Sequence, residues 1–255
     1  MNSHTDISYY FVIDLMYSDA FGHWVYESAI YLPIFKKLKE MYSNIKVVLK
    51  ERKDFKSLFL NFFNISPSEV IYIENMSATN VCFFPSPISS LNDNIYFTEN
   101  YKQILNRFIQ LFHNYKTEKK VLYDCIVLPR QSKENYINNN RYYNFLPIYT
   151  FLKNTHMTYN MLHTDEVTDL VFQIQTLRSA PNIILTGGSP FLVNNMFCIN
   201  SKIAILDTIT LNQANIYVKI KNIIDTVCKI NNNRIEYIPK EINFHFQAEN
   251  VNTTG

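Results

Sequence analysis

Short apolar runs alternate with amphipathic stretches through the first half of the chain. Brief runs of β-branched and aromatic residues are typical of buried strands, whereas apolar residues spaced by three and four indicate half-buried helices. This pattern predicts strands over residues 9–15, 45–49, 70–73 and 81–84. It predicts helices over residues 24–42, entered at His23, over 54–63 and over about 98–115.

The alternation is cleaner in the second half. The pattern predicts strands over residues 121–128, 157–162, 182–185 and 202–206, and helices over about 144–154, over 165–180 and from 189 onward. Strand–helix–strand repeats with short links favour a parallel sheet covered on both faces. A polar stretch at residues 116–120 marks the expected junction. We therefore expect two α/β domains, residues 1–117 and 118–255, with a cleft between them.

Composition narrows the class of protein. Of the 255 residues, 47% are hydrophobic and 15% aromatic, which excludes a disordered chain and allows a substantial core. The net charge of +2 is too small to indicate a nucleic-acid or membrane-surface partner by bulk electrostatics. An RNA-binding surface of Tyr, Phe and Lys is disfavoured as well, because the aromatic residues follow core periodicity.

The cysteines and the N-terminus bear on the compartment. The four cysteines are widely separated and form no CxxC pair, so zinc and redox motifs have no support, and free thiols suit a reducing compartment. The opening residues, MNSHTDIS, lack the basic and apolar regions of a signal peptide, and no apolar run approaches the length of a membrane span. We expect a cytoplasmic protein without a membrane span.

Glycine is scarce, and its positions single out two segments. Average usage predicts about eighteen glycines in a chain of this length, yet there are four, and Gly255 is terminal. The interior ones are Gly22, Gly187 and Gly188. A chain that avoids glycine is expected to keep it where a Cβ cannot be accommodated.

The paired glycines follow a predicted strand. Residues 183–185 run into Thr186, Gly187 and Gly188, and Ser189 with Pro190 has the composition that starts a helix. Backbone N–H groups and the helix dipole at this junction favour a phosphate or another anion. A plain tight turn is an equal alternative.

A group of cations follows the strand expected at residues 121–128. Arg130 comes directly after Pro129, and Lys133 and Arg141 lie in the polar segment beyond it. At the carboxyl edge of a shared sheet these cations and the glycine turn converge on one crevice, as a diphosphate requires. Solvated loop charges are the alternative, above all for Lys133.

His23 and Glu27 form the other candidate site. Their spacing of four places the imidazole and the carboxylate on one helical face. A carboxylate there orients the ring and raises its basicity, as a general base acting on a hydroxyl needs. A capping or core histidine is the alternative.

Three segments, in order, resemble the family-61 glycosyltransferases. They read FGHWVYESAIYLPIFKKL, IVLPRQSKENYINNNRYYN and TDEVTDLVFQIQTLRSAPNIILTGGSPFLVNNMF, and they lie between about residues 20 and 210. The first is similar to the family's Phe-Gly-His-Trp helix start, the second to its strand-then-Arg segment. The third resembles its GxHGAxLxN turn, with Gln173, Ala180, Leu192, Asn194 and Phe197 in register.

The resemblance implies a GT-B architecture of two Rossmann-like domains, with the donor held mainly by the C-terminal domain and the acceptor on the side of the N-terminal domain. It implies inverting transfer of a hexose or pentose, commonly from a UDP-sugar such as UDP-xylose or UDP-GlcNAc, to a hydroxyl of a glycan or protein. His23, oriented by Glu27, then acts as the base. The diphosphate is then held by Arg130, Lys133, Arg141 and residues 186–189, with Asn194 or Asn195 positioning it or the sugar. Asp207 is a weaker candidate for the ribose.

No DxD motif is present, so the expected enzyme needs no metal and no cofactor beyond its nucleotide-sugar co-substrate. The chain departs from the family where a His aligns with Gly188 and small residues align with Ser189, Pro190 and Phe191. This departure leaves a catalytically inactive nucleotide- or glycan-binding relative as the alternative. Eukaryotic relatives are commonly secretory, whereas the N-terminus here favours a microbial or viral enzyme.

Overall fold

Two parallel sheets organise the chain in a computed structural model that describes residues 9–14, 20–76, 81–83, 98–117, 120–129, 145–164, 166–206 and 214–238. The chain divides into an N-terminal unit, residues 1–108 with 168–170, and a C-terminal unit, residues 109–167 with 171–255. The division falls inside helix α4 (Glu99–His113). The expected α/β class with parallel strands is confirmed.

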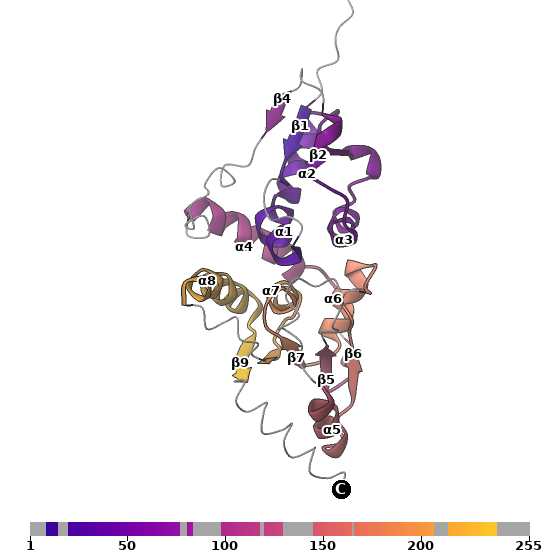
Figure 1. Ribbon diagram of the computed structural model, residues 1–255, viewed down its shortest axis with the longest axis vertical. Helices are drawn as coiled ribbons and strands as arrows, with labels where there is room; N and C mark the ends of the chain where they lie inside the picture. Colours follow the sequence, from indigo (N-terminus) through magenta and orange to yellow (C-terminus); the bar gives the residue numbers. More distant parts are fainter. Residues whose placement is uncertain are drawn as a thin grey trace, which may run out of the picture. The chain divides into compact units, whose positions relative to one another are not determined.

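Sheet A of the N-terminal unit contains β1 (Tyr9–Val12), β2 (Lys46–Leu49), β3 (Val70–Tyr72) and β4 (Val81–Phe83). Its order is β3-β2-β1-β4, and each neighbouring pair is parallel (Figure 1). The chain moves outward from β1 to β3 and then returns to place β4 beside β1. This reversal creates a topological switch point between β1 and β4, the position where open α/β sheets bind ligands.

The helices of this unit differ from the prediction in one respect. The helix expected over residues 24–42 is three pieces: α1 (Phe21–Glu27), the 3₁₀ turn η1 (Ala29–Tyr31) and α2 (Leu32–Met41). Ser28 leaves the helical region with φ −131° and ψ −56°, and Pro33 occupies the first turn of α2. Because proline lacks an N–H group, it fits the start of a new helix better than the interior of a continuous one.

The remaining elements of the unit are α3 (Asp54–Phe62) and the 3₁₀ turns η2 (Pro67–Glu69) and η3 (Ile73–Asn75). Aromatic pairs connect elements of the unit: the ring centroids of Phe11 on β1 and Phe35 on α2 lie 6.3 Å apart, and those of Phe59 on α3 and Phe108 on α4 lie 6.5 Å apart. The Tyr101 hydroxyl donates a hydrogen bond of 2.9 Å to the Tyr26 carbonyl and so fixes α1 to α4.

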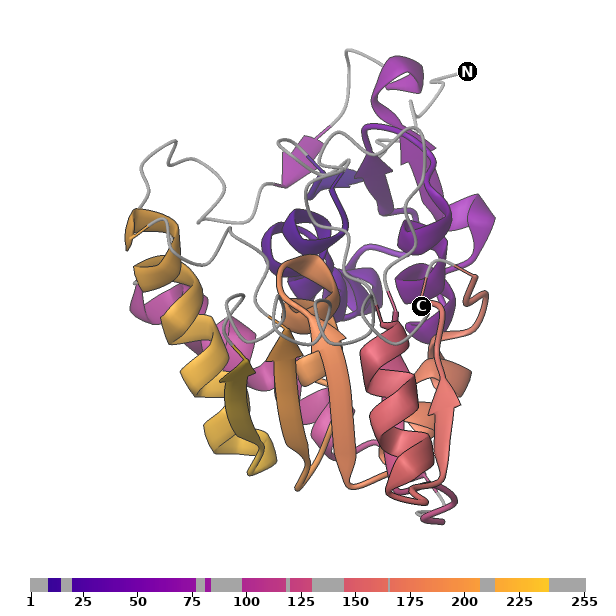
Figure 2. The ribbon, with the colours of Figure 1, turned by 60° about the horizontal axis from the view of Figure 1, so that its bottom comes forward.

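Sheet B of the C-terminal unit contains β5 (Cys125–Leu128), β6 (Tyr159–Met161), β7 (Asn182–Thr186), β8 (Lys202–Leu206) and β9 (Arg234–Ile238). Its order is β6-β5-β7-β8-β9, again parallel throughout, and Figure 2 shows the orange and yellow strands β7, β8 and β9 side by side. Here the switch point lies between β5 and β7. The helices of the unit are α5 (Leu146–Asn154), α6 (Leu170–Arg178), α7 (Ser189–Asn195) and α8 (Ala214–Asn231).

Several predicted boundaries in this unit were too wide. Strand β5 begins at Cys125 rather than at residue 121, and the preceding Val121 and Leu122 are exposed. Helix α6 covers only part of the helix expected over residues 165–180. Helix α8 and strand β9 lie beyond the last element that the sequence pattern predicts, and they extend sheet B by one strand.

A buried arginine joins the end of α4 to α6 and α7. The guanidinium of Arg178 donates to three carbonyls: Nε to Phe197 at 3.0 Å, Nη1 to Tyr115 at 2.6 Å, and Nη2 to Phe112. Burial lowers the pKa of this guanidinium from its usual value, although nearby Cys198 and Tyr115 oppose the change. The negative end of the α4 dipole favours a cation at this position.

We predict that Arg178→Lys destabilises the protein by about 3 kcal/mol, because an ammonium group cannot reach all three carbonyls and leaves buried acceptors unsatisfied. Urea denaturation followed by far-ultraviolet circular dichroism measures the change. Arg234→Lys, on an exposed side chain of β9, is the matched control and should change stability by less than about 0.5 kcal/mol. Equal effects of the two variants would show that the Arg178 contacts contribute nothing specific.

Candidate functional site

Helix α1 carries the predicted acid–base pair. Nδ1 of His23 lies 2.8 Å from Oε1 of Glu27, and the two side chains are 50% and 21% exposed. When the neutral ring donates its Nδ1–H to this carboxylate, its lone pair lies on Nε2. The pair therefore has the geometry of a histidine oriented by a carboxylate.

The burial pattern of α1 explains why these two side chains lie on its outer face. Trp24, Val25 and Tyr26 are buried, and the helix begins where the Trp24 N–H bonds the Ala20 carbonyl at 2.9 Å. Because α1 is the first helix after β1, the pair follows the carboxyl end of a strand at the switch point of sheet A.

A third titratable side chain lies near this pair. Burial, and after it the Glu27 carboxylate, raises the pKa of Tyr31 above its usual range. Its phenol is therefore even less able than an ordinary tyrosine to act as a base near neutral pH.

In the C-terminal unit, the glycine turn joins β7 to α7. Gly188 caps α7 with φ 91° and ψ −151°, a region that only glycine occupies without strain, so Ser189 is the first helical residue and not the cap. Gly187 has no positive φ, and its N–H continues the sheet by bonding the Leu206 carbonyl at 3.2 Å. Only the second glycine is therefore required by backbone conformation.

Thr186, the last residue of β7, is fully buried, and its Oγ1 has no hydrogen-bond partner among the described residues. A buried hydroxyl without a partner is unfavourable, so an oxygen of a bound molecule would stabilise it. Because β7 pairs with β5, this hydroxyl lies at the switch point of sheet B.

The predicted cations that follow β5 are Arg130, Lys133 and Arg141, and they lie outside the described residues, as does Asp207 after β8. The structure does show where the segment that carries the three cations begins. Strand β5 ends at Leu128, in register with Leu185 of β7, so the described chain before this segment ends beside the strand that leads into the glycine turn.

Asn194 and Asn195 of α7 have buried amides with partners inside the unit. Asn194 accepts from Nε2 of Gln173 at 2.6 Å and donates to the Pro190 carbonyl at 2.6 Å. Asn195 accepts from Nδ2 of Asn233 at 2.9 Å. These contacts hold α7 and the turn before it in place.

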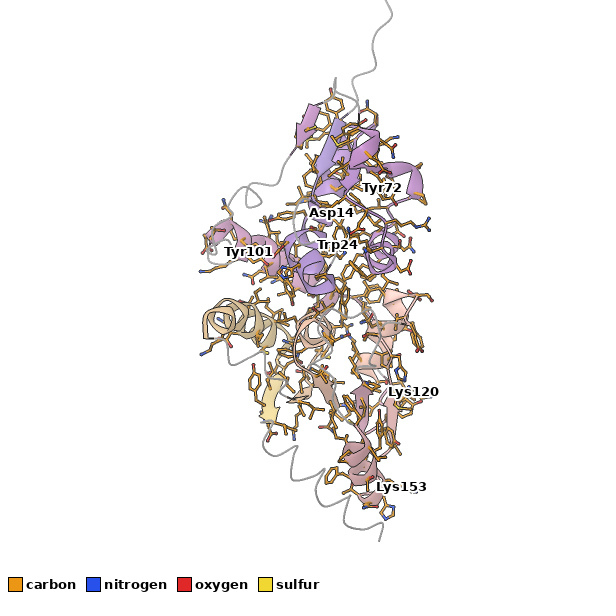
Figure 3. The ribbon with its side chains drawn as sticks, in the orientation of Figure 1. Asp14, Trp24, Tyr72, Tyr101, Lys120 and Lys153 are labelled. Atoms are coloured by element: carbon orange, nitrogen blue, oxygen red, sulfur yellow. The ribbon has the colours of Figure 1, made fainter. Side chains whose placement is uncertain are left out.

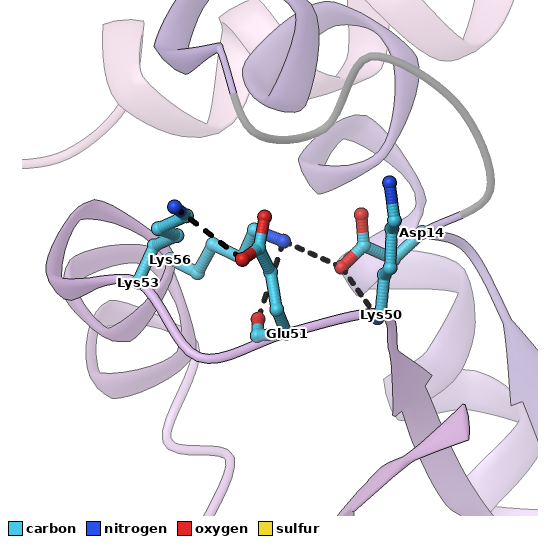
Figure 4. Close-up of polar contacts among 5 residues, drawn as sticks. All are labelled: Asp14, Lys50, Glu51, Lys53 and Lys56. Carbon is cyan, nitrogen blue, oxygen red and sulfur yellow. Dashed lines mark hydrogen bonds and ion pairs between the residues drawn. The ribbon is translucent and has the colours of Figure 1, made fainter. Parts of the chain in front are cut away.

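The sequence analysis missed a buried ion pair at the carboxyl edge of sheet A. Oδ2 of Asp14, just beyond β1, accepts from Nζ of Lys56 at 2.6 Å and from the Lys50 backbone N–H at 2.8 Å, as Figure 4 shows. Lys56 on α3 also donates to the Glu51 carbonyl at 3.3 Å, and its ammonium lies 5.3 Å from the Trp24 ring centroid. An acidic residue directly after a buried strand was the one available signal.

We predict that Gly188→Ala destabilises the protein by about 1–3 kcal/mol, because a Cβ strains the backbone at this φ and ψ. Thermal unfolding measures the loss. Ser189→Ala is the matched control, since Ser189 is the first helical residue and not the N-cap, and it should stay within about 0.5 kcal/mol of the wild type. A Gly188→Ala variant as stable as the control would contradict the strained turn.

No protein-family model matches the chain, and no curated protein is significantly similar to it. Within the described parts, no group of three or more His, Cys, Asp or Glu side chains could hold a metal ion. No helix there is both long and apolar enough to cross a membrane. The functional assignment consequently depends on the motifs and on the geometry of their residues.

Proposed function

We propose that the protein is an inverting, metal-independent glycosyltransferase of GT-B type. It transfers a sugar from a nucleotide sugar, a UDP-sugar such as UDP-xylose or UDP-GlcNAc, to a hydroxyl of a glycan or protein. The observation that carries the proposal is the hydrogen bond of 2.8 Å between His23 and Glu27 on a helix that follows a switch-point strand. Two parallel α/β sheets are compatible with the Rossmann-like domains that such enzymes use.

In the proposed reaction, Nε2 of His23 removes the proton of the acceptor hydroxyl while that oxygen attacks the anomeric carbon. The bond from this carbon to the diphosphate oxygen breaks, and the nucleoside diphosphate leaves with the electron pair. One in-line displacement inverts the anomeric centre. Glu27 stabilises the imidazolium that forms, which makes the histidine a stronger base.

The departing diphosphate requires donors and positive charge. In this proposal the Thr186 hydroxyl donates to a diphosphate oxygen, and Arg130, Lys133 and Arg141 supply the charge. The support is topological: β5 and β7 are adjacent and parallel, so the residues after them start from the same sheet edge. Asn194 and Asn195 act indirectly, by positioning the turn.

The cysteines support a reducing, cytoplasmic compartment for this enzyme in a microbe or a virus-infected cell. All four cysteines are free, and burial raises the pKa of Cys125 and of Cys198 to about 12. Thiols with such a pKa are almost fully protonated near neutral pH, which fits a packing role for these two side chains. The support for a reducing compartment is the free state of the four cysteines.

We predict that His23→Gln lowers kcat for sugar transfer by a factor of about 10²–10⁴, the usual contribution of a general base. Glu27→Gln should lower it by about 10-fold, because the ring keeps a partner but loses the charge that stabilises the imidazolium. Lys37→Gln on the exposed face of α2 is the matched control and should not change kcat. Ligand-observed NMR with UDP-, GDP- and CMP-sugars first identifies the nucleotide sugar that binds. The assay then measures product formation from that nucleotide sugar.

Each outcome of this assay separates the alternatives. Undiminished turnover in His23→Gln would exclude this residue as the base. A wild-type protein that binds a nucleotide sugar but never transfers the sugar would contradict the proposed reaction. That result would instead support an inactive nucleotide- or glycan-binding relative.

We predict that Thr186→Val weakens donor binding by about 5- to 10-fold, which corresponds to one lost hydrogen bond of about 1 kcal/mol. The same variant should be at least as stable as the wild type without ligand, because valine matches the shape of threonine and removes an unpartnered buried hydroxyl. Calorimetry with UDP and thermal unfolding measure the two effects. Unchanged UDP affinity together with lower stability would assign the hydroxyl a purely structural role.

A further inference from the structure

Two buried polar atoms of the N-terminal unit lack hydrogen-bond partners among the described residues. They are Oδ1 of Asp14, an acceptor, and Nε1 of Trp24, a donor, and both side chains have 0% exposure. Figure 3 labels both residues within this unit. Buried polar atoms of native proteins are nearly always paired, so two orphans in one place need a physical reason.

Lys56 connects the two side chains that carry these atoms. Its ammonium bonds Oδ2 of Asp14 at 2.6 Å and lies 5.3 Å from the Trp24 ring centroid. Oδ2 also accepts from the Lys50 N–H at 2.8 Å, whereas Oδ1 has no hydrogen-bond partner among the described residues. One carboxylate oxygen therefore holds the fold, while the second remains available as an acceptor.

The chemistry of the two atoms restricts what they can bind. A hydroxyl group can donate to Oδ1 and accept from the indole N–H, and so it satisfies both atoms. An anion would meet the carboxylate, and an ammonium group has no lone pair to offer to the indole. Because Lys56 already balances the charge of Asp14, the cluster favours a neutral hydroxyl group.

The position of the cluster indicates a ligand rather than a packing defect. Asp14 lies just beyond β1 at the switch point of sheet A, and Trp24 lies on α1, the helix that carries His23. Helices α1 and α3 also carry Phe21 and Phe55, which are half-buried with ring centroids 5.5 Å apart. Aromatic surface with a few convergent polar atoms is the usual composition of a small-molecule site.

We propose that the carboxyl edge of sheet A binds a neutral sugar through one hydroxyl, which donates to Oδ1 of Asp14 and accepts from Nε1 of Trp24. This sugar is the acceptor of the transfer reaction, and that identification rests on the function proposed above. The binding site itself does not depend on it. Away from bulk water, the two hydrogen bonds are stronger than at the surface.

The test uses the fact that Trp24 is the only tryptophan of the chain. In ¹⁵N-labelled protein the indole N–H gives one cross-peak, which reports on this donor alone. We expect the peak to shift saturably when methyl β-D-galactopyranoside, methyl β-D-glucopyranoside or methyl α-D-mannopyranoside is added at millimolar concentration. No shift with any of the three, or an indole N–H that contacts bound water throughout the titration, would overturn the proposal.

A second variant separates binding from folding. Trp24→Phe keeps an aromatic ring beside Lys56 and removes the N–H donor together with the fused second ring, whereas a change at Asp14 would leave the buried Lys56 ammonium without its carboxylate. In saturation-transfer NMR, the glycoside that binds the wild-type protein should give at least a 5-fold weaker signal with Trp24→Phe than with the wild type. Phe151→Leu, an exposed aromatic of α5, is the control and should leave the signal unchanged. Equal glycoside binding by Trp24→Phe and wild type would place the sugar elsewhere and refute the site.

The outcomes distinguish this inference from the proposed function. An indole shift without sugar transfer supports the site and contradicts the transfer reaction. Sugar transfer without an indole response in the acceptor titration overturns the site and leaves the transfer reaction intact.

Discussion

Parallel pairing of the described strands is the constraint on which the account depends. In parallel sheets every strand ends at the same edge, so residues far apart in the chain meet there. Asp14 after β1 and the glycine turn after β7 both occupy such an edge, each next to the switch point of its own sheet. Among the described residues, the buried side-chain polar atoms without a hydrogen-bond partner are on Asp14, Trp24 and Thr186, and they belong to these two regions.

In the buried pair of Asp14 and Lys56, one carboxylate oxygen of Asp14 stabilises the fold and the other is the proposed ligand acceptor. Two charges taken out of water are costly unless their geometry is good, and removing one of them typically costs about 3–5 kcal/mol. Oδ2 of Asp14 meets that condition with two donors at 2.6 and 2.8 Å. Because these contacts join β1 to the end of β2 and to α3, the edge from which α1 starts is rigid, and Oδ1 is held in a fixed direction.

Periodicity predicted the α/β class, the order of most elements and the positions of His23, Glu27 and the glycine turn. The pattern could not show the break at Ser28, because Trp24 and Phe35 keep helical spacing on both sides of it. It also gave no sign that the amides of Asn194 and Asn195 are used within the fold, since their partners Gln173 and Asn233 are distant in sequence. The Asp14–Lys56 pair could not be predicted either, because its two residues are distant in sequence and because a lysine on a helix normally indicates a solvated face.

The central claim is that the carboxyl edge of sheet B, at β5 and β7, binds the diphosphate of a nucleotide sugar. Hydrogen–deuterium exchange followed by mass spectrometry, with and without UDP, tests it most directly. The account predicts slower exchange in peptides that cover residues 128–133 and 185–192, and unchanged exchange in α8 and β9. Protection confined to other segments, or none at saturating UDP, would contradict it.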